Sequence, residues 1–170
     1  RVGFNNKGSA TAMLAPAVFK SLGVNVTEHY MSQPDALQKM RNGELDATVC
    51  MCPKPVPAYA ALRADSGFRM VEVPFAPALQ SKYLPATIVA DDYSAIIPKG
   101  AKIETIASST VLITFNWPKG SLRYNRTAKF VDALFSKFAE LQKPPRHPLW
   151  KTVNYAANIE GWQRFPAAQE

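Results

Sequence analysis

Hydrophobic positions in the first half of the chain change repeatedly between the period of a strand and the period of a helix. Short apolar or alternating runs predict strands over residues 1–4, 24–30 and 46–52. Helical spacing between them predicts helices over residues 10–22 and 32–43, each followed or ended by a glycine. Because strands alternate with helices, we expect an α/β fold with a parallel sheet and covering helices.

The pattern in the second half is less regular. It predicts a short helix over 57–63, strands over 68–73 and 103–115, and a long helix over 121–142. Two sets of residues carry further expectations. Those expected to be buried in the last strand are Val111, Leu112 and Ile113. Those giving the long helix an apolar stripe are Val131, Leu134, Phe135, Phe138 and Leu141.

Two features flank these elements. A turn is expected at Asp91–Asp92–Tyr93, where two carboxylates without a third nearby do not indicate a metal site. After Pro144–Pro145, which should stop the long helix, four aromatic residues form a tail that we expect to pack across another surface. They are Trp150, Tyr155, Trp162 and Phe165.

Composition narrows the function classes. The chain has 170 residues, of which 47% are hydrophobic, so it is globular. Its net charge is +7, but the basic residues are spread along the sequence. With no dense basic run and no helix-turn-helix pattern, we expect no nucleic-acid partner, and the charge gives only weak support for an anionic ligand. The abrupt start in a strand, without Met or leader, suggests a fragment of a longer protein.

The loop between the first strand and the first helix is the main candidate site. Ser9 is a good N-cap, and Gly8 allows a sharp bend and a close backbone approach. Free amides at a helix start, together with the charge of Lys7, predict a cradle for a carboxylate or phosphate. An ordinary capped helix after a tight turn is the alternative. The candidate ligand-binding residues are Asn5, Lys7, Gly8, Ser9, Ala10 and Thr11.

A proline-rich segment supplies the second part of the candidate site. Residues 52–57 contain three prolines, which stiffen the exit of the third predicted strand. Ligands of open α/β sheets bind at the carboxyl ends of strands, so Lys54 is placed to face an anion. A rigid connector with a solvated lysine is the alternative. The candidate residues here are Cys52, Lys54 and Pro55.

The two cysteines, Cys50 and Cys52, are predicted to be free, metal-free thiols. At i, i+2 on a strand both side chains would point to one face, and a disulfide between them would be strained. No histidine lies near them in sequence to complete a zinc site. We expect no metal and no cofactor, since the chain also lacks a nucleophile elbow, a metal-ligand cluster and a dinucleotide fingerprint.

Four motifs in this order resemble the TAXI family of solute receptors, which serve TRAP transporters. They are Gly8-Ser9-Ala10-Thr11, Gly43-Glu44-Leu45-Asp46-Ala47 before the Pro53-Lys54-Pro55 turn, the run 86–93, and Thr110-Val111-Leu112-Ile113. The resemblance implies the type II periplasmic-binding-protein fold. Residues 1–98 then correspond to a three-layer αβα second lobe, and residues 99–170 to the segment that returns to the first lobe.

The resemblance also implies a role for the candidate residues. Ser9 and Thr11 are expected to contact a ligand carboxylate, and the Cys52–Pro55 turn to line the same cleft. Ala10 stands where the family usually has a second glycine, which narrows access to the backbone.

The leading hypothesis is a periplasmic binding protein that passes a small organic anion, such as an amino acid or dicarboxylate, to membrane transporter subunits. We expect no enzymatic activity. One alternative is the effector-binding domain of a transcription regulator with the same fold, and another is an enzyme that uses Cys50 or Cys52 as nucleophile. Because half the cleft would lie in the first lobe, we expect this chain alone to bind solute weakly and to self-associate.

Overall fold

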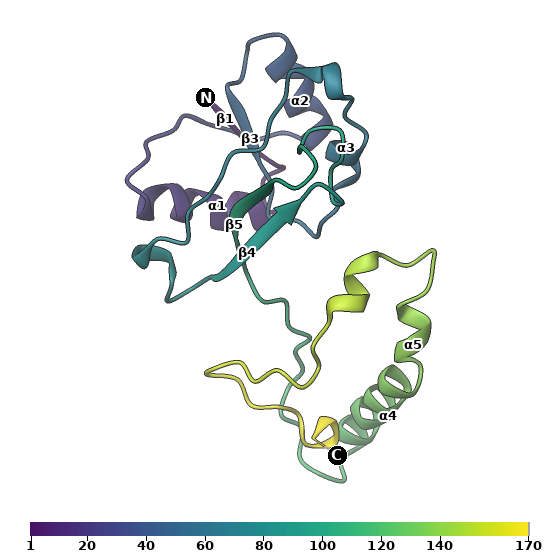
Figure 1. Ribbon diagram of the computed structural model, residues 1–170. Coiled ribbons are helices and arrows are strands. Elements are labelled where there is room, and N and C mark those ends of the chain that lie inside the picture. Colours follow the sequence, from purple (N-terminus) through teal and green to yellow (C-terminus); the bar gives the residue numbers. More distant parts are fainter. Residues whose placement is uncertain (170) are drawn as a thin grey trace. The chain divides into compact units, whose positions relative to one another are not determined.

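The computed structural model describes residues 1–169 and is a mixed α/β structure with small sheets. It divides into two compact units, Arg1–Ser109 and a second unit that begins at Thr110 (Figure 1). Unit 1 holds both sheets, and unit 2 is helical. The border between the two compact units therefore falls at residues 109/110 of the sequence, and the ligand-lobe boundary expected at residues 98/99 stays a prediction.

A three-stranded parallel sheet forms the centre of unit 1. Its strands are β1 (Val2–Phe4), β2 (Glu28–His29) and β3 (Ala47–Val49), in the order β2-β1-β3. In the register, Val2 lies opposite Glu28 on one side and Ala47 on the other. The predicted alternation of strands and helices and the parallel pairing are confirmed, although β2 and β3 are much shorter than the predicted runs.

Two helices cover opposite faces of this sheet. α1 (Ala10–Ser21) packs its Ala15 against Val2 and Phe4, which point to one face of β1. α2 (Gln33–Arg41) approaches the other face, where a Cβ added to Gly3 would lie 3.1 Å from the Cβ of Ala36. Side chains alternate between the two faces of a strand. Val2 and Phe4 therefore fill the face of β1 that packs against α1, while Gly3, which has no side chain, allows α2 to approach the other face closely. Figure 1 shows both helices beside the sheet.

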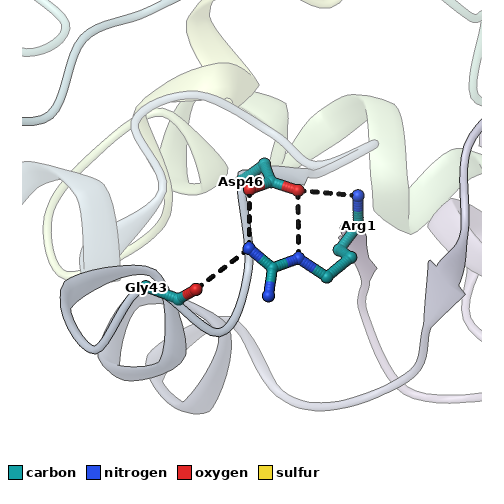
Figure 2. A network of polar contacts seen from close by, with 3 residues as sticks. All are labelled: Arg1, Gly43 and Asp46. Atoms are coloured by element: carbon teal, nitrogen blue, oxygen red, sulfur yellow. Dashed lines mark hydrogen bonds and ion pairs between the residues drawn. The ribbon is translucent and has the colours of Figure 1, made fainter.

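Hydrogen bonds of the Arg1 side chain connect the start of β1 to the turn before β3 (Figure 2). Its guanidinium Nη2 donates to the carbonyl of Gly43 and to Asp46 Oδ1, both at 2.9 Å, and its Nε donates to Asp46 Oδ2 at 3.2 Å. These hydrogen bonds from Arg1 hold the pKa of the Asp46 carboxyl well below its usual range. The pair is exposed, so it aligns the two strand starts rather than stabilising the core.

A second sheet contacts α1 through Ile106 of its second strand, which packs against the core cluster of Val18. β4 (Leu84–Val89) and β5 (Lys102–Ala107) are antiparallel, with Ile88 opposite Ile103. The turn predicted at residues 91–93 closes β4, beginning one residue earlier. Val18 of α1 forms a core cluster with Leu79 and Tyr83, which lie in and after the 3₁₀ helix Pro77–Leu79. α1 thus contributes Ala15 to one core cluster and Val18 to another.

The segment between the two sheets is mostly irregular. The helix predicted over 57–63 is shorter than expected and forms only α3 (Pro57–Ala60). A separate 3₁₀ helix follows over Ala64–Ser66. The strand predicted over 68–73 does not form. Val73 N donates to the carbonyl of Glu104 on β5 at 3.0 Å, but no ladder extends from this bond. A run with high β propensity becomes a strand only where a neighbour completes the pairing.

Unit 2 is built around α4 (Leu122–Ser136), followed by α5 (Phe138–Leu141). The single helix predicted over 121–142 is therefore broken at Lys137 (φ −105°). Two 3₁₀ helices follow, Pro148–Thr152 and Pro166–Ala168. The aromatic tail lies along the helices: Tyr155 contacts Phe135 and Phe138 at ring centroid distances of 5.6 and 5.2 Å. Among the described residues no helix is both long and apolar enough to cross a bilayer.

The predicted burial of residues 111–113 is wrong. β5 ends at Ala107, and the chain from 108 to 117 forms no strand. Leu112 is 75% exposed, and Val111 and Ile113 are also exposed. These residue types are typical of a buried strand, but no neighbouring strand in the described part of the chain pairs with them. The apolar stripe of the long helix is likewise only half-buried, and Tyr124 is the one buried residue described in unit 2.

Candidate functional site

The candidate residues lie at the carboxyl ends of the three parallel strands. The loop after β1 contains residues 5–9, Tyr30 follows β2, and the segment 50–57 follows β3. From β1 the chain passes to β2 on one side and returns to β3 on the other, so the strand order reverses at β1. In open α/β sheets such a reversal opens a crevice at this edge.

The loop after β1 has the local structure that its sequence predicts. Gly8 takes a left-handed conformation (φ +82°), which favours glycine. Ser9 is the N-cap of α1, and its Oγ accepts a hydrogen bond from Ala12 N at 3.2 Å. Asn5 stays within the loop, where its Oδ1 accepts from Asn6 N at 2.8 Å. The prediction that Ser9 caps the first helix is therefore confirmed.

The amides at this helix start are only partly free for a ligand. The amide of Ser9, expected to face an anion, instead donates to the carbonyl of Asn6 at 3.1 Å, because the glycine turn folds the loop back on itself. Gly8 and Ala10 are exposed, and their amides donate to no acceptor in residues 1–169. The open donor at the first position of α1 is thus the amide of Ala10.

Lys7 and Tyr30 form the wall of a shallow depression beside the helix start. The Nζ of Lys7 lies 5.6 Å from the centroid of the Tyr30 ring, a cation–π distance. The depression has a volume of about 300 Å³ and is also lined by Gly8, Ala12 and Met13. Tyr30 Oη donates to Glu28, which raises the pKa of the phenol. The depression therefore combines one cation, Lys7, with the apolar side chains of Ala12 and Met13.

Thr11 lies inside the fold rather than at the open surface. It is 1% exposed, and its Oγ1 accepts a hydrogen bond from Met51 N at 2.9 Å. This bond connects the start of α1 to the segment after β3. The structure thus brings the two sequence-predicted parts of the site together, through a hydroxyl that was expected to face a ligand.

The prediction of free thiols is wrong: Cys50 and Cys52 form a disulfide. The prediction assumed a strand through residue 52, but β3 ends at Val49 and both cysteines lie in irregular chain. Their Cα atoms are 5.4 Å apart, within the usual range for a disulfide. In this form neither sulfur is available as a nucleophile. The described residues contain no cluster of three or more metal-ligating side chains.

Lys54 is held by its own chain. Its Nζ donates to the carbonyl of Thr87 on β4 and to Asp92 Oδ2, both at 2.8 Å. Asp92 Oδ2 also accepts from Val89 N at 2.9 Å, and Val56 N, just beyond Pro55, donates to Tyr93 Oη at 2.8 Å. Lys54 therefore anchors the proline-rich segment to the second sheet, and 41% of its side chain remains accessible to solvent.

A polar network at the same sheet edge was not found from the sequence. Tyr59 Oη and Thr48 Oγ1 donate to Gln33 Oε1 at 2.6 and 2.9 Å, and Gln33 Nε2 donates to the carbonyl of Val49 at 2.8 Å. Burial raises the pKa of Tyr59 to about 12. The three residues are far apart in sequence and belong to no motif, so only the fold reveals that they meet.

Comparison of the chain with models of protein families found no match, and comparison with curated proteins also found none.

Proposed function

We propose that this chain is the ligand-binding part of a periplasmic receptor that captures a small organic anion for a TRAP-type membrane transporter. In this proposal residues 1–98 of unit 1 correspond to the second lobe of a type II periplasmic-binding-protein fold, as the resemblance to TAXI receptors implies. The observation that carries the proposal is the open amide of Ala10 at the start of α1, next to the cation of Lys7 and at the strand-order reversal.

The chemistry of this corner favours a carboxylate. The N-terminal end of a helix carries a partial positive charge, and its unpaired amides point at a bound anion. The ammonium of Lys7 adds a full charge on the same side. Ser9 supplies a further donor, because its Oγ accepts from Ala12 N and its own proton remains free to donate.

The neighbouring surface suits a short organic anion with some apolar character. Met13 and the ring of Tyr30 lie along the depression that Lys7 borders. The depression is open and shallow, so it covers one side of a ligand. Small ligands bind tightly when about 70–90% of their surface is buried. We therefore expect binding to this chain alone to be weak, without a submicromolar ligand.

Ala10→Pro is the sharpest variant for testing the proposal. Proline removes the amide donor of Ala10, yet it is well tolerated at the first position of a helix. Ser9 already has the extended conformation that a residue before proline adopts (φ −74°, ψ 159°). Amide chemical shifts would be followed by NMR while acetate, glutamate and succinate are titrated, with chloride at equal ionic strength as reference.

In the wild-type chain we expect the carboxylates, and not chloride, to shift the signals of Gly8, Ser9 and Ala10. In Ala10→Pro the affinity should fall about tenfold, the value of one hydrogen bond to a charged group. Ala10→Gly is the matched control, since it keeps the amide and should bind at least as well as wild type. Carboxylates that move no signals in this loop, or equal affinity in Ala10→Pro, would refute the proposal.

A further inference from the structure

Most of the net positive charge of the protein lies in unit 2. Residues 110–170 contain nine Lys and Arg against four Asp and Glu, so they carry +5 of the net +7. Three of the cations, Arg123, Arg126 and Lys129, lie in the first half of α4 and are exposed. The first turn of this helix has no acidic residue, and within residues 1–169 none of the three cations forms an ion pair.

Cations in the first half of α4 lower the stability of this helix. The start of a helix is its positive end, where acidic side chains are favourable and cations are not. Arg123, Arg126 and Lys129 also repel one another, being three to six residues apart on the same helix. An external anionic partner relieves both effects at once.

Large apolar side chains are exposed on the same face. Leu122 and Phe130 are 66% and 52% exposed, and they flank Arg126 at four-residue spacing. Beside the helix start, the guanidinium of Arg123 lies 4.6 Å from the centroid of the Trp117 ring, and Phe115, which is 76% exposed, packs against that ring at 5.1 Å. Cations and apolar groups are therefore interleaved.

We propose that this surface binds an anionic lipid bilayer. We define the α4 face by Phe115, Leu122, Arg123, Arg126, Lys129 and Phe130. An open depression of about 530 Å³, lined by Leu122, Asn125, Arg126, Ala128 and Lys129, offers two cations next to an apolar edge. This combination matches an anionic headgroup above acyl chains, where aromatic and aliphatic side chains enter the interface and Arg and Lys reach the phosphates.

Charge complementarity calls for an anionic partner, and the exposed apolar side chains among the cations favour a bilayer over an acidic protein. The six residues are exposed on one helix and on the loop before it, so they meet a broad, deformable surface more readily than a shaped binding partner. In this arrangement α4 lies on the membrane and does not cross it. The inference goes beyond solute binding and does not depend on it.

Vesicle co-sedimentation of the full chain tests the inference. The probes are phosphatidylcholine vesicles with and without phosphatidylglycerol, at low and at physiological ionic strength. We expect binding to the anionic vesicles only, weakening as salt shortens the range of the charges. In Arg126→Gln/Lys129→Gln the partition coefficient should fall about 25-fold, because each cation near an anionic surface contributes about fivefold.

Lys20→Gln/Lys82→Gln is the matched control. It removes the same charge from exposed positions in unit 1 and should change the partition coefficient little. Circular dichroism of each variant checks that the helices remain. No binding of the wild-type chain to anionic vesicles overturns the inference, as does an equal loss in the control, which would reflect net charge alone. Light scattering that shows the α4 face joining two copies, with no vesicle binding, also overturns it.

Discussion

The amide of Met51 donates a 2.9 Å hydrogen bond to the buried hydroxyl of Thr11, a residue that precedes it by 40 positions. Thr11 belongs to the first turn of α1, and Met51 lies between the two cysteines that follow β3. The candidate ligand loop and the segment after β3 are therefore coupled through one hydroxyl. A substitution in the candidate ligand loop should therefore alter the segment after β3, and a substitution in that segment should alter the loop.

Thr11→Val should destabilise the protein by about 1–3 kcal/mol, because it leaves the amide of Met51 without its acceptor while keeping the volume of the side chain. The free energy of unfolding is measured by urea denaturation. Thr11→Ser is the control, since it keeps the hydroxyl. Hydrogen exchange at Met51 should accelerate in the valine variant and not in the serine variant. Unchanged exchange in Thr11→Val would show that the bond is absent in solution.

Asp92 should matter more to stability than the lysine that it binds. Its Oδ2 accepts from both Lys54 Nζ and Val89 N, whereas Lys54 is partly exposed. We expect Asp92→Ala to lower the free energy of unfolding by about 2 kcal/mol and Lys54→Met by about 1 kcal/mol or less. Denaturant titration of both variants measures the difference. A larger loss in Lys54→Met than in Asp92→Ala contradicts this account of the anchor.

Tyr59 should make stability depend on alkaline pH. Its pKa is about 12 in the folded chain against 10.0 for a free phenol, because burial disfavours the phenolate. A raised pKa means that the stabilisation is complete below pH 10 and is lost as the pH rises toward 12. The contribution is about 2–3 kcal/mol in free energy of unfolding.

Denaturation of wild type and Tyr59→Phe at several pH values measures this contribution. The variant should be less stable near pH 8, where it lacks the hydrogen bond to Gln33, and should lose less stability between pH 10 and 12. Parallel pH curves for the two proteins would mean that Tyr59 ionises as easily in the folded state as in the unfolded state.

The disulfide predicts the outcome of a thiol assay. Without reductant, denatured protein should contain no titratable sulfur, because Cys50 and Cys52 are bonded to each other. After reduction both sulfurs should react. Cys50→Ser is the control and should leave a single thiol, Cys52, that reacts without reductant. Two thiols in the untreated wild-type protein would restore the original prediction from the sequence.

The exposed apolar run should favour self-association. Val111, Leu112 and Ile113 are exposed, uncharged and β-prone, and such segments pair with other chains. Light scattering should find species larger than a monomer in the wild-type chain. In Leu112→Ser/Ile113→Ser the dissociation constant should rise about tenfold or more, since two large side chains no longer leave water on association. A monomeric wild-type chain at high concentration would contradict this prediction.

Local signals predicted the first part of the fold well. Ser9 and Ser32 cap helices that begin where the sequence places them, because caps and helical spacing act within a few residues. The first and last residues of the strands were harder to predict from the sequence. Residues 68–73 and 111–115 have β propensity, but strand formation depends on a partner that the sequence of the segment itself does not specify.

The sequence predicted where the candidate residues lie along the elements, but not how their side chains are oriented. Spacing placed Thr11 at a helix start, yet only the packing of α1 on the sheet determines that its hydroxyl turns inward to Met51. Lys54 was correctly assigned to the loop after β3, whereas its bond to Thr87 on β4 depends on how the second sheet folds back. Such contacts join residues that no local pattern relates.

Unit 2 has one buried residue among those described, Tyr124, although α4 is the longest helix of the chain. A helix of this length is marginal in water when tertiary packing contributes little. Opening of α4 should therefore require much less free energy than global unfolding, and its amides should exchange with deuterium by local fluctuation. The amides of α1, which contributes to both core clusters of unit 1, should exchange only when unit 1 unfolds as a whole. The two units would then form separate cooperative folding units within one chain.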